Sequence, residues 1–300
     1  MELRQLRYFD AVARARSFTA AALDLHVAQS ALSQQVAKLE RELGVELLRR
    51  TTRRVEVTEA GELVLARGRR ALAEAGAIRA DLDALRGLVR GRLRIGGVPP
   101  VSGLHPAAII AEFGRTYPGV DITIREEVAA QLLVELGDGS LDLVLALIDP
   151  RELSPNLTGR RLLDEELVLI TAPDHPLAAR KRVPHAALTG EPLVAYGLGS
   201  ALRAELERLV AEPRVIAEAN ELATLRELVA LGLGVTLMPA AVVKDTPPEV
   251  LAVRPLSPRV RVPVSMLWRA HEAPTPAARA FREHVLAVLA GDVPAAPIHP

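Results

Sequence analysis

The sequence of 300 residues contains no cysteine, so it offers no disulfide framework, no thiol nucleophile and no cysteine-based metal site. It has no run of about eighteen apolar residues, so no membrane-spanning helix and no membrane partner are expected. Its amphipathic start lacks the apolar block of a secretory signal. We therefore expect a cytoplasmic protein, with neither a metal nor a cofactor.

The sequence also lacks net charge, because 37 basic residues balance 37 acidic ones. The balance conceals an uneven distribution. Residues 1–94 hold 18 basic and 12 acidic side chains, whereas the remainder holds 19 and 25. A basic front and an acidic rear are typical of a DNA-binding module joined to a domain with another task. Chance drift between the two halves is the alternative, and the length alone predicts two or three domains.

Two short periodic runs near the N-terminus predict a helix-turn-helix. A helix over 3–15 precedes them, and the first run has its apolar face at Ala21, Ala22 and Leu25. After an interruption at 26–28, the second run continues to Gly44, a residue suited to a left-handed helix cap. Two helices joined by about three residues form the motif that places its second helix in a DNA major groove.

The polar face of the second helix indicates which residues read DNA. Gln, Ser and Lys can bond base edges or phosphates, and a pair of strands around Thr51 and Thr52 would lay arginines along the backbone. An ordinary helical hairpin with a solvated polar face is the alternative. The predicted DNA-binding residues are Gln29, Ser30, Ser33, Gln34, Lys38, Arg49, Arg53 and Arg54.

From Thr58 the sequence predicts one long helix with a heptad-like apolar seam. Such a seam needs a partner, so we expect a dimerisation helix; packing on the second domain of the same chain is the alternative. The predicted dimerisation residues are Ala71, Ala75, Ile78, Leu82, Leu85 and Val89.

Beyond a predicted hinge at 87–91, strand and helix patterns alternate, which predicts parallel sheets with right-handed crossovers. The expected strands include 92–98, 120–126, 141–148, 164–172, 192–196, 215–218, 235–238 and 262–268. The expected helices are 106–117, 130–138, 202–210, 223–231 and 275–289.

The run AAALDLHVAQSALSQQVAKLERELGVELLRR, followed by TEAG at 58–61, resembles the N-terminal domain of LysR-type transcriptional regulators. Two positions depart from the family pattern, since Ala28 stands where Ser or Thr is usual and Leu48 where Phe is usual. LRIGG, FGRTYPGVDITI, LGDGSLDLVLAL, APDHPLA and LRELVALGLGVTLMPA resemble the family's effector-binding domain.

The resemblance implies an all-α winged helix-turn-helix at 1–58 and a linker helix at 59–89. The resemblance also implies that a two-lobed α/β effector domain follows, similar to type 2 periplasmic binding proteins. Lobe I is expected at 90–161 and 266–290, lobe II at 162–265, and a loose tail at 291–300. The implied partners are double-stranded DNA carrying an interrupted inverted repeat, an unknown small-molecule effector and further copies of the chain, as a homodimer or homotetramer.

An effector should lie beyond the carboxyl ends of the strands. Ser102 and Ser200 are candidate hydrogen-bond donors, and Arg203 is a candidate partner for a carboxylate. A hydrated loop serine and an arginine that decorates a helix are the alternatives. The predicted effector-binding residues are Pro99, Val101, Ser102, Val128, Ile148, Gly199, Ser200, Arg203 and Thr224.

Two other functions compete with a ligand-responsive regulator. An enzyme is disfavoured because the sequence shows no phosphate loop, no GxSxG elbow and no recognisable carboxylate pair, and so no predicted catalytic residue. His175, which precedes a proline, is a better turn residue than a catalytic base. A plain solute-binding protein is disfavoured by the basic N-terminal module.

Overall fold

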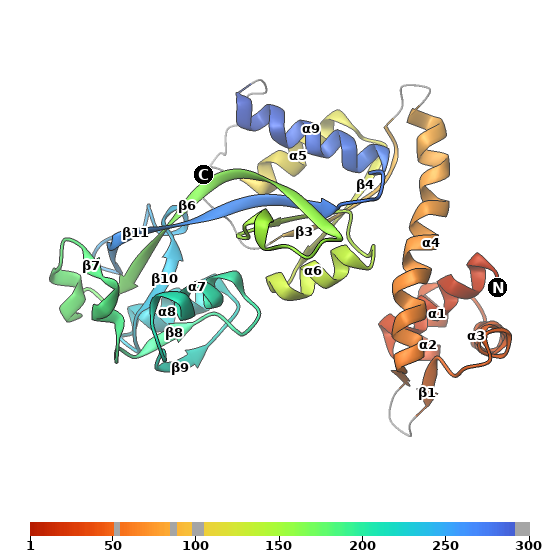
Figure 1. Ribbon diagram of the computed structural model, residues 1–300, viewed down its shortest axis with the longest axis horizontal. Helices are drawn as coiled ribbons and strands as arrows, with labels where there is room; N and C mark the ends of the chain where they lie inside the picture. The colour runs from red at the N-terminus through yellow and green to blue at the C-terminus, as the bar shows by residue number, and fades with distance from the viewer. Residues whose placement is uncertain (51–54, 85–88, 98–104, 292–300) are drawn as a thin grey trace. The chain divides into compact units, whose positions relative to one another are not determined.

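The computed structural model describes residues 1–50, 55–84, 89–97 and 105–291 (Figure 1). The chain divides into two compact units. The first comprises Met1–Gly91 together with Gly137–Ser140, and the second comprises the remainder. Each unit is described by itself.

The first unit contains the predicted helix-turn-helix. Its elements are α1 (Leu3–Ala15), α2 (Phe18–Asp24), α3 (Gln29–Leu43), β1 (Leu48–Arg50), β2 (Val55–Val57) and α4 (Glu59–Ala84). Side-chain caps fix two of the helix starts, because Ser17 Oγ accepts from the Ala20 amide and Thr58 Oγ1 from the Gly61 amide. Gly44 ends α3 with a φ of 71°, as the sequence predicts.

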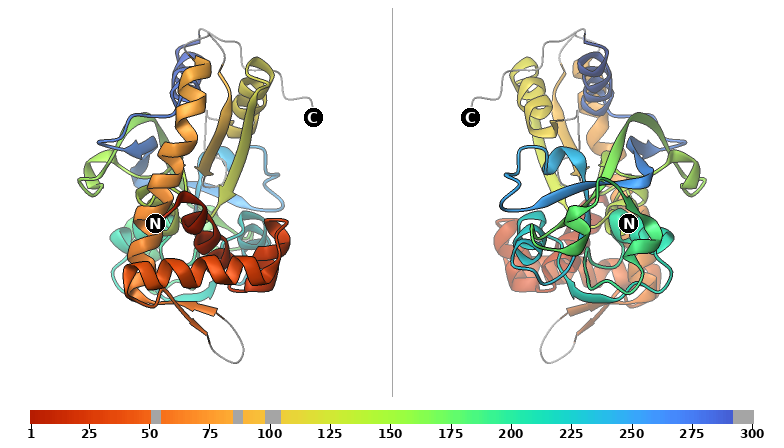
Figure 2. Two further views of the ribbon diagram at one scale, coloured as in Figure 1. Left: turned by 90° about the vertical axis from the view of Figure 1, so that its right-hand side faces the viewer. Right: turned by 90° about the vertical axis from the view of Figure 1, so that its left-hand side faces the viewer.

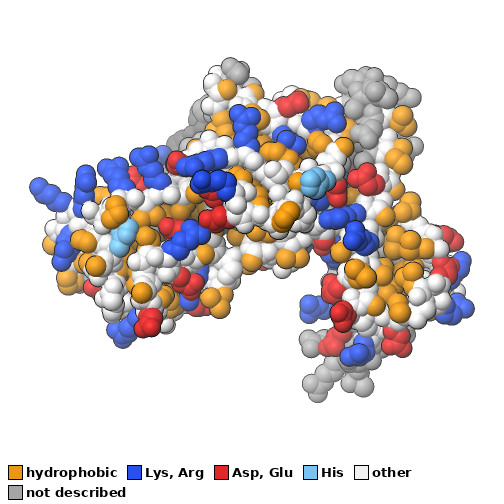
Figure 3. All heavy atoms as spheres, viewed as in Figure 1, with side chains coloured by type: hydrophobic (Ala, Val, Ile, Leu, Met, Phe, Trp, Pro, Cys, Tyr) orange, Lys and Arg blue, Asp and Glu red, His pale blue; other side chains and the backbone are white. Residues whose placement is uncertain are grey.

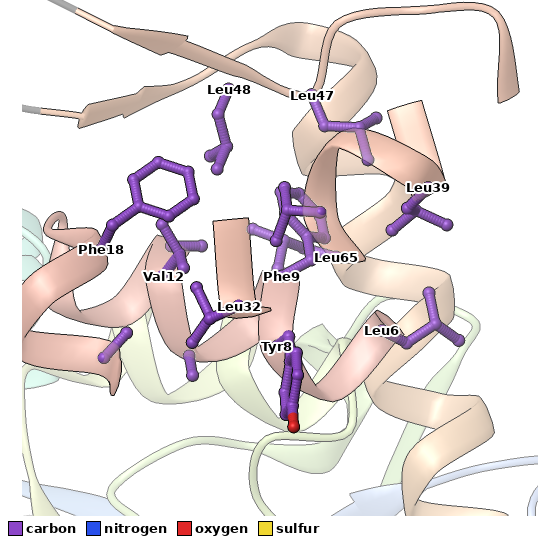
Figure 4. Packing of buried hydrophobic residues seen from close by; sticks show 14 of the residues in the cluster. Leu6, Tyr8, Phe9, Val12, Phe18, Leu32, Leu39, Leu47, Leu48 and Leu65 are labelled. Atoms are coloured by element: carbon purple, nitrogen blue, oxygen red, sulfur yellow. The ribbon is translucent and has the colours of Figure 1, made fainter. Parts of the chain in front are cut away.

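One apolar cluster holds this unit together (Figure 4). The buried faces of α1, α2 and α3 meet in it, joined by Leu47 and Leu48 before and in β1, and by Leu65 from α4. Phe9, Leu32 and Leu39 are at most 1% exposed. Because these side chains come from every helix of the unit, their burial fixes how α3 sits on the others.

α4 is a single long helix beside α1 (Figure 2). Its first part packs on α1, where a Cβ added at Gly68 would lie 3.2 Å from Leu6. Further along, Ile78 and Leu82 are 62% and 55% exposed. The prediction that helix and seam continue through Val89 is wrong at its end, because Val89 lies outside the helix just before β3; Leu85 lies outside the described residues.

The second unit combines long strands with short helices. Its strands are β3 (Gly91–Gly97), β4 (Val120–Glu126), β5 (Leu143–Ala146), β6 (Leu157–Thr171), β7 (Val183–Pro184), β8 (Leu193–Ala195), β9 (Val215–Glu218), β10 (Thr236–Pro239) and β11 (Ala252–Arg269). Its α-helices are α5 (Pro106–Thr116), α6 (Ala129–Gly137), α7 (Ala201–Leu209), α8 (Leu222–Ala230) and α9 (Pro276–Ala290). Short 3₁₀ helices occur at η1 (Pro150–Glu152), η2 (Pro176–Ala179), η3 (His185–Leu188) and η4 (Ala240–Val242).

The principal sheet is mixed, which corrects the prediction of parallel sheets. Its order is β10-β6-β11-β5-β3-β4. β11 runs antiparallel to both β6 and β5, and β10 runs antiparallel to β6. Parallel pairing is seen between β3 and β5, between β8 and β9, and between β7 and β11. The strand–helix alternation therefore describes the flanking strands but not the two long ones.

β6 and β11 run side by side through the unit and connect two lobes (Figures 1 and 2). One lobe contains β3, β4, β5, α5, α6 and α9, where the rings of Phe113 and Phe281 meet edge to face at 5.1 Å. The other contains β8, β9, β10, α7 and α8 around a core that includes Leu225, Val229 and Met238. In the first lobe a Cβ at Gly96 would lie 2.7 Å from Leu141 Cδ1 and 2.9 Å from Leu132 Cδ2 of α6, so a larger residue on β3 would force these side chains to shift.

Candidate functional site

The first turns of α3 present the polar side chains that the sequence singles out. Gln29, Ser30 and Gln34 are exposed, and Ser33 is half-buried. On the opposite side of α3, Leu32, Val36 and Leu39 are completely or almost completely buried. This amphipathic arrangement holds the helix on the domain core while its N-terminal polar face remains available to a partner.

Ala28 occupies the N-cap position of α3 and makes no side-chain cap hydrogen bond. Its backbone nevertheless has the extended N-cap conformation, with φ −66° and ψ 133°. The helix start that carries the candidate DNA-reading residues is therefore built without the hydroxyl that caps α2, α4 and α9.

Lys38 lies near the other end of this polar face and has carboxylates beside it. Its Nζ is 3.5 Å from Glu2 Oε1 and 3.9 Å from Glu42 Oε1. The N-terminal ammonium, which donates a hydrogen bond to Glu42, lowers the pKa of that carboxyl. A DNA phosphate would have to compete with these carboxylates for Lys38, so its contribution to binding should be smaller than that of an unpaired lysine.

β1 and β2 form the predicted wing, an antiparallel pair in which Leu48 lies opposite Val57. Leu48 is 6% exposed and belongs to the domain core, so the family's usual phenylalanine is replaced by a side chain that still packs. Arg49 is exposed on β1. Arg53 and Arg54, which the sequence also assigns to the wing, lie outside the described residues.

The second unit contains a cavity of about 490 Å³ that both lobes line. The lining comes from the start of α6, the end of β5 with η1, the loop before α7, α7 itself and one stretch of β11. The residues are Ala129, Ala130, Leu133, Leu147, Ile148, Asp149, Glu152, Leu153, Leu198, Gly199, Ser200, Ala201, Arg203, Ala204, Glu205, Glu207, Arg208, Arg261, Val262 and Pro263. The volume lies within the range of small-molecule sites.

Four of the predicted effector-binding residues line this cavity: Ile148, Gly199, Ser200 and Arg203. Val128 and Thr224 are outside its lining, although a Cβ at Gly199 would lie 3.7 Å from Val128 Cγ2. Pro99, Val101 and Ser102 lie outside the described residues. The Ala130 amide donates to the Gly199 carbonyl at 3.1 Å, which joins the two lobes at one edge of the cavity.

The two polar anchors that the sequence proposes already have partners. Ser200 Oγ caps α7 by accepting from the Leu202 amide. Arg203 donates to Glu207 and to Glu218, each at 2.7 Å, and its side chain is 11% exposed. These acceptors, the Glu218 hydrogen bond foremost, raise the pKa of Arg203. An incoming carboxylate would therefore meet a guanidinium that two carboxylates already hold.

Sequence reasoning placed the effector near Ile148 and Asp149 but missed other charged residues of the cavity. Arg208 donates to Glu205 at 2.9 Å on its own helix and lies 3.3 Å from Glu152 in the other lobe. Asp149 is held by Arg151, whose side-chain hydrogen bond lowers the pKa of that carboxyl to about 2. The signals were an Asp-Pro pair after a buried strand and the alternating charges of α7; nothing in the sequence pointed to Arg261 on β11.

Two histidines of the second unit have structural partners. His175 is the predicted turn residue, because its Nδ1 accepts from the Leu177 amide at the start of η2. His185 Nε2 lies 2.8 Å from the Pro258 carbonyl oxygen. Within the described parts of the chain, no group of three or more His, Asp or Glu side chains is arranged to hold a metal ion, and no helix is long and apolar enough to span a membrane.

Basic side chains are not confined to the first unit. Figure 3 shows Lys and Arg side chains along the edge of the second unit near β7. The exposed run Arg180, Lys181 and Arg182 immediately precedes that strand. The overall acidic balance of the rear of the chain therefore does not extend to all of its surface.

Two known protein families match the two parts of the chain. Residues 3–62 match the bacterial regulatory helix-turn-helix protein, lysR family, and residues 86–290 match the LysR substrate binding domain. A probable hydrogen peroxide-inducible genes activator of Streptomyces viridosporus is 38% identical, over 81% of this chain and 78% of that protein.

Two full-length solved structures are also similar. An OxyR from Pseudomonas aeruginosa, with a cysteine replaced by aspartate, is 29% identical with a TM-score of 0.75, over 96% of this chain and 94% of that chain. CbnR in complex with its target DNA is 26% identical with a TM-score of 0.62, over 95% of this chain and 99% of that chain. The polar face of α3, the long α4 and the two-lobed second unit therefore belong to a DNA-binding transcriptional regulator with an effector-binding domain, and the chain is a member of the LysR family.

Proposed function

We propose that this regulator binds an interrupted inverted repeat as a homodimer and answers to a small molecule held reversibly in the cavity of its second unit. The direct DNA contacts would come from Gln29, Ser30, Ser33, Gln34 and Lys38 on α3, and the backbone contacts from Arg49, Arg53 and Arg54. Differential affinity of the effector for two arrangements of the lobes would change the DNA-bound oligomer.

Dimerisation through α4 is supported by the exposure of its seam. Ile78 and Leu82 are four residues apart and therefore lie on one face, and each exposes more than half of its surface in the single chain. Ala71 is exposed and Ala75 half-buried on the same helix. A two-fold dimer would cover these side chains and would present two α3 helices to two half-sites.

Reversible binding, rather than oxidation, is supported by where the sulfur atoms lie. The relative from Streptomyces viridosporus is named for peroxide, and oxidation of sulfur by peroxide requires an accessible thiol or thioether. This chain has no cysteine and three methionines. Met238 and Met266 are 0% exposed, and Met1 is the exposed one. The cavity is therefore the better candidate for the sensing site, and it is the observation that carries the proposal.

Peroxide provides the first test. The purified chain would be treated with hydrogen peroxide, and its affinity for an operator fragment measured by fluorescence anisotropy before and after a reductant. We expect unchanged affinity, with mass spectrometry showing oxidation at Met1 alone. A reversible change in DNA affinity would contradict the proposal.

The cavity provides the second test. Small molecules retained by the natively purified chain would be released by denaturation and identified by mass spectrometry. Ala204→Trp places a large ring at the cavity wall, so this variant should retain DNA binding and lose the retained molecule. Leu231→Trp, at an exposed position that is not part of the cavity lining, is the matched control. Equal retention by both variants would refute an effector site here.

A further inference from the structure

The charged side chains around the cavity are unevenly matched. Arg203 lies between two carboxylates, Glu207 and Glu218. Arg208 likewise lies between Glu205 and Glu152. The cavity lining itself holds four carboxylates, Asp149, Glu152, Glu205 and Glu207, and three guanidinium groups, Arg203, Arg208 and Arg261. A negative local balance disfavours an anion and favours a cation.

The arginines differ in how firmly they are held. The side chain of Arg203 is 11% exposed and donates to two carboxylates and to the Tyr196 carbonyl. Arg208 is 60% exposed, whereas its partner Glu205 is 14% exposed. A solvent-exposed arginine loses little when it leaves such a pair. Arg208 is therefore the guanidinium that a ligand can displace, and Glu205 is the fixed acceptor that would remain.

Asp149 repeats this arrangement at the end of β5. The carboxylate is 15% exposed, and Arg151, which holds it, is 84% exposed. Two carboxylates of the cavity lining, Asp149 and Glu205, are thus each paired with an arginine that is much more exposed than the carboxylate is. Both would offer a charge-assisted hydrogen bond to a ligand nitrogen that took the place of the arginine.

Apolar side chains form the rest of the wall. Leu133 and Leu153 come from one lobe, Leu198 from the other, and Val262 and Pro263 from the strand that joins them. A ligand with one charged end and an apolar body would satisfy both kinds of surface.

We propose that the cavity binds an organic cation, a small molecule with an ammonium or guanidinium group on an apolar body, and that this group displaces Arg208 from Glu205 and Glu152. The inference rests on the proposed effector cavity and adds the chemical class of its ligand. Because Glu205 and Glu152 belong to different lobes, the ligand cation would take over the lobe-to-lobe contact that Arg208 makes in the structure.

Two probes of matched shape and opposite charge test the ligand class. Phenethylammonium and hydrocinnamate would each be titrated calorimetrically into the full-length chain at neutral pH and low salt. We expect heat of binding for the ammonium and none for the carboxylate over the same concentration range. Binding of the carboxylate in preference to the ammonium, or of neither probe, would overturn the proposal.

Variants test the displacement itself. Glu205→Gln should weaken phenethylammonium binding by about tenfold, because it removes a charged hydrogen-bond acceptor. Arg208→Ala should tighten binding, because it removes the competing guanidinium. Glu227→Gln, an exposed position on α8 outside the cavity lining, should change nothing. Weaker or unchanged binding by Arg208→Ala would refute displacement, and this result does not depend on whether Glu205→Gln folds.

The two proposals fail in different ways. A chain that retains a neutral or anionic molecule, lost on Ala204→Trp, would overturn the cation and leave the effector cavity in place. Retention that is insensitive to Ala204→Trp would overturn the cavity itself. DNA binding by each variant, measured on the same operator fragment, checks that the first unit is intact in every case.

Discussion

Replacing Ala28 by serine should stabilise the start of α3. The backbone of Ala28 already has the extended N-cap conformation. In the same chain Ser17, Thr58 and Thr275 each accept from the amide three residues onward, at 3.0–3.3 Å. A serine at position 28 can make the corresponding bond with the Ala31 amide. Such a cap stabilises a helix by about 1 kcal/mol.

Native-state hydrogen exchange of the full-length chain measures this change where it occurs. A stabilisation of about 1 kcal/mol slows exchange of the Ala31 amide by roughly fivefold. Ser17→Ala is the matched control, since it removes an existing cap from α2 and should speed exchange of the Ala20 amide by a similar factor. If Ala28→Ser left Ala31 exchange unchanged while Ser17→Ala behaved as expected, the N-cap geometry assigned to α3 would be wrong.

Further predictions concern the dimer, an ion pair and the core. Ile78→Glu combined with Leu82→Glu should shift the chain toward monomer in sedimentation velocity, since both side chains would be covered in a dimer; an unchanged mass would favour packing within one chain. Arg151→Ala should return the lowered pKa of Asp149, about 2, toward its ordinary value of 3.8, as a carbon-13 NMR titration would measure. Because the pKa is depressed in the folded chain, the stability that this pair contributes is present above pH 3.8 and is lost as the pH falls toward 2. Phe281→Ala should cost about 3–5 kcal/mol in denaturant unfolding, because the ring is 0% exposed and packs edge-on against Phe113; a cost below about 1 kcal/mol would contradict that packing.

The first unit could be predicted almost completely from the sequence. Its helices are amphipathic with clear ends: Ser17 and Thr58 cap two starts, and Gly44 ends α3 in a left-handed conformation. The apolar seam of α4 was also visible, although its last predicted residue, Val89, is not helical. Local signals were sufficient here because short-range contacts determine these elements.

The two long strands could not be predicted in full. The N-terminal part of β6 is rich in charged residues, and β11 contains Pro255, Pro258 and Pro263, so neither has the alternation that marks a strand. The two strands are instead stabilised by antiparallel pairing with each other, between residues far apart in the sequence. Because β11 also pairs antiparallel with β5, the sheet is mixed.

Some residues of the cavity could be predicted from the sequence, and their charged partners could not. Ile148, Gly199, Ser200 and Arg203 were selected because they follow strands, and all four line it. The prediction that Arg203 awaits a carboxylate overlooked Glu207, one turn along the same helix, and could not foresee Glu218, which reaches it from β9. The lobe-to-lobe contact between Arg208 and Glu152 is equally invisible in the sequence, because 56 positions separate them.

The central claim is that the N-terminal turns of α3 give this regulator its DNA specificity. Mapping the genomic DNA bound by the purified chain, beside Gln29→Ala and the control Glu62→Ala on exposed α4 surface, tests that claim most directly. We expect discrete sites containing an inverted repeat for the wild type and for the control. These sites should be lost with Gln29→Ala, since a bidentate base contact contributes about 1–3 kcal/mol of discrimination. The same set of sites bound equally well by Gln29→Ala would contradict a role for α3 in specificity.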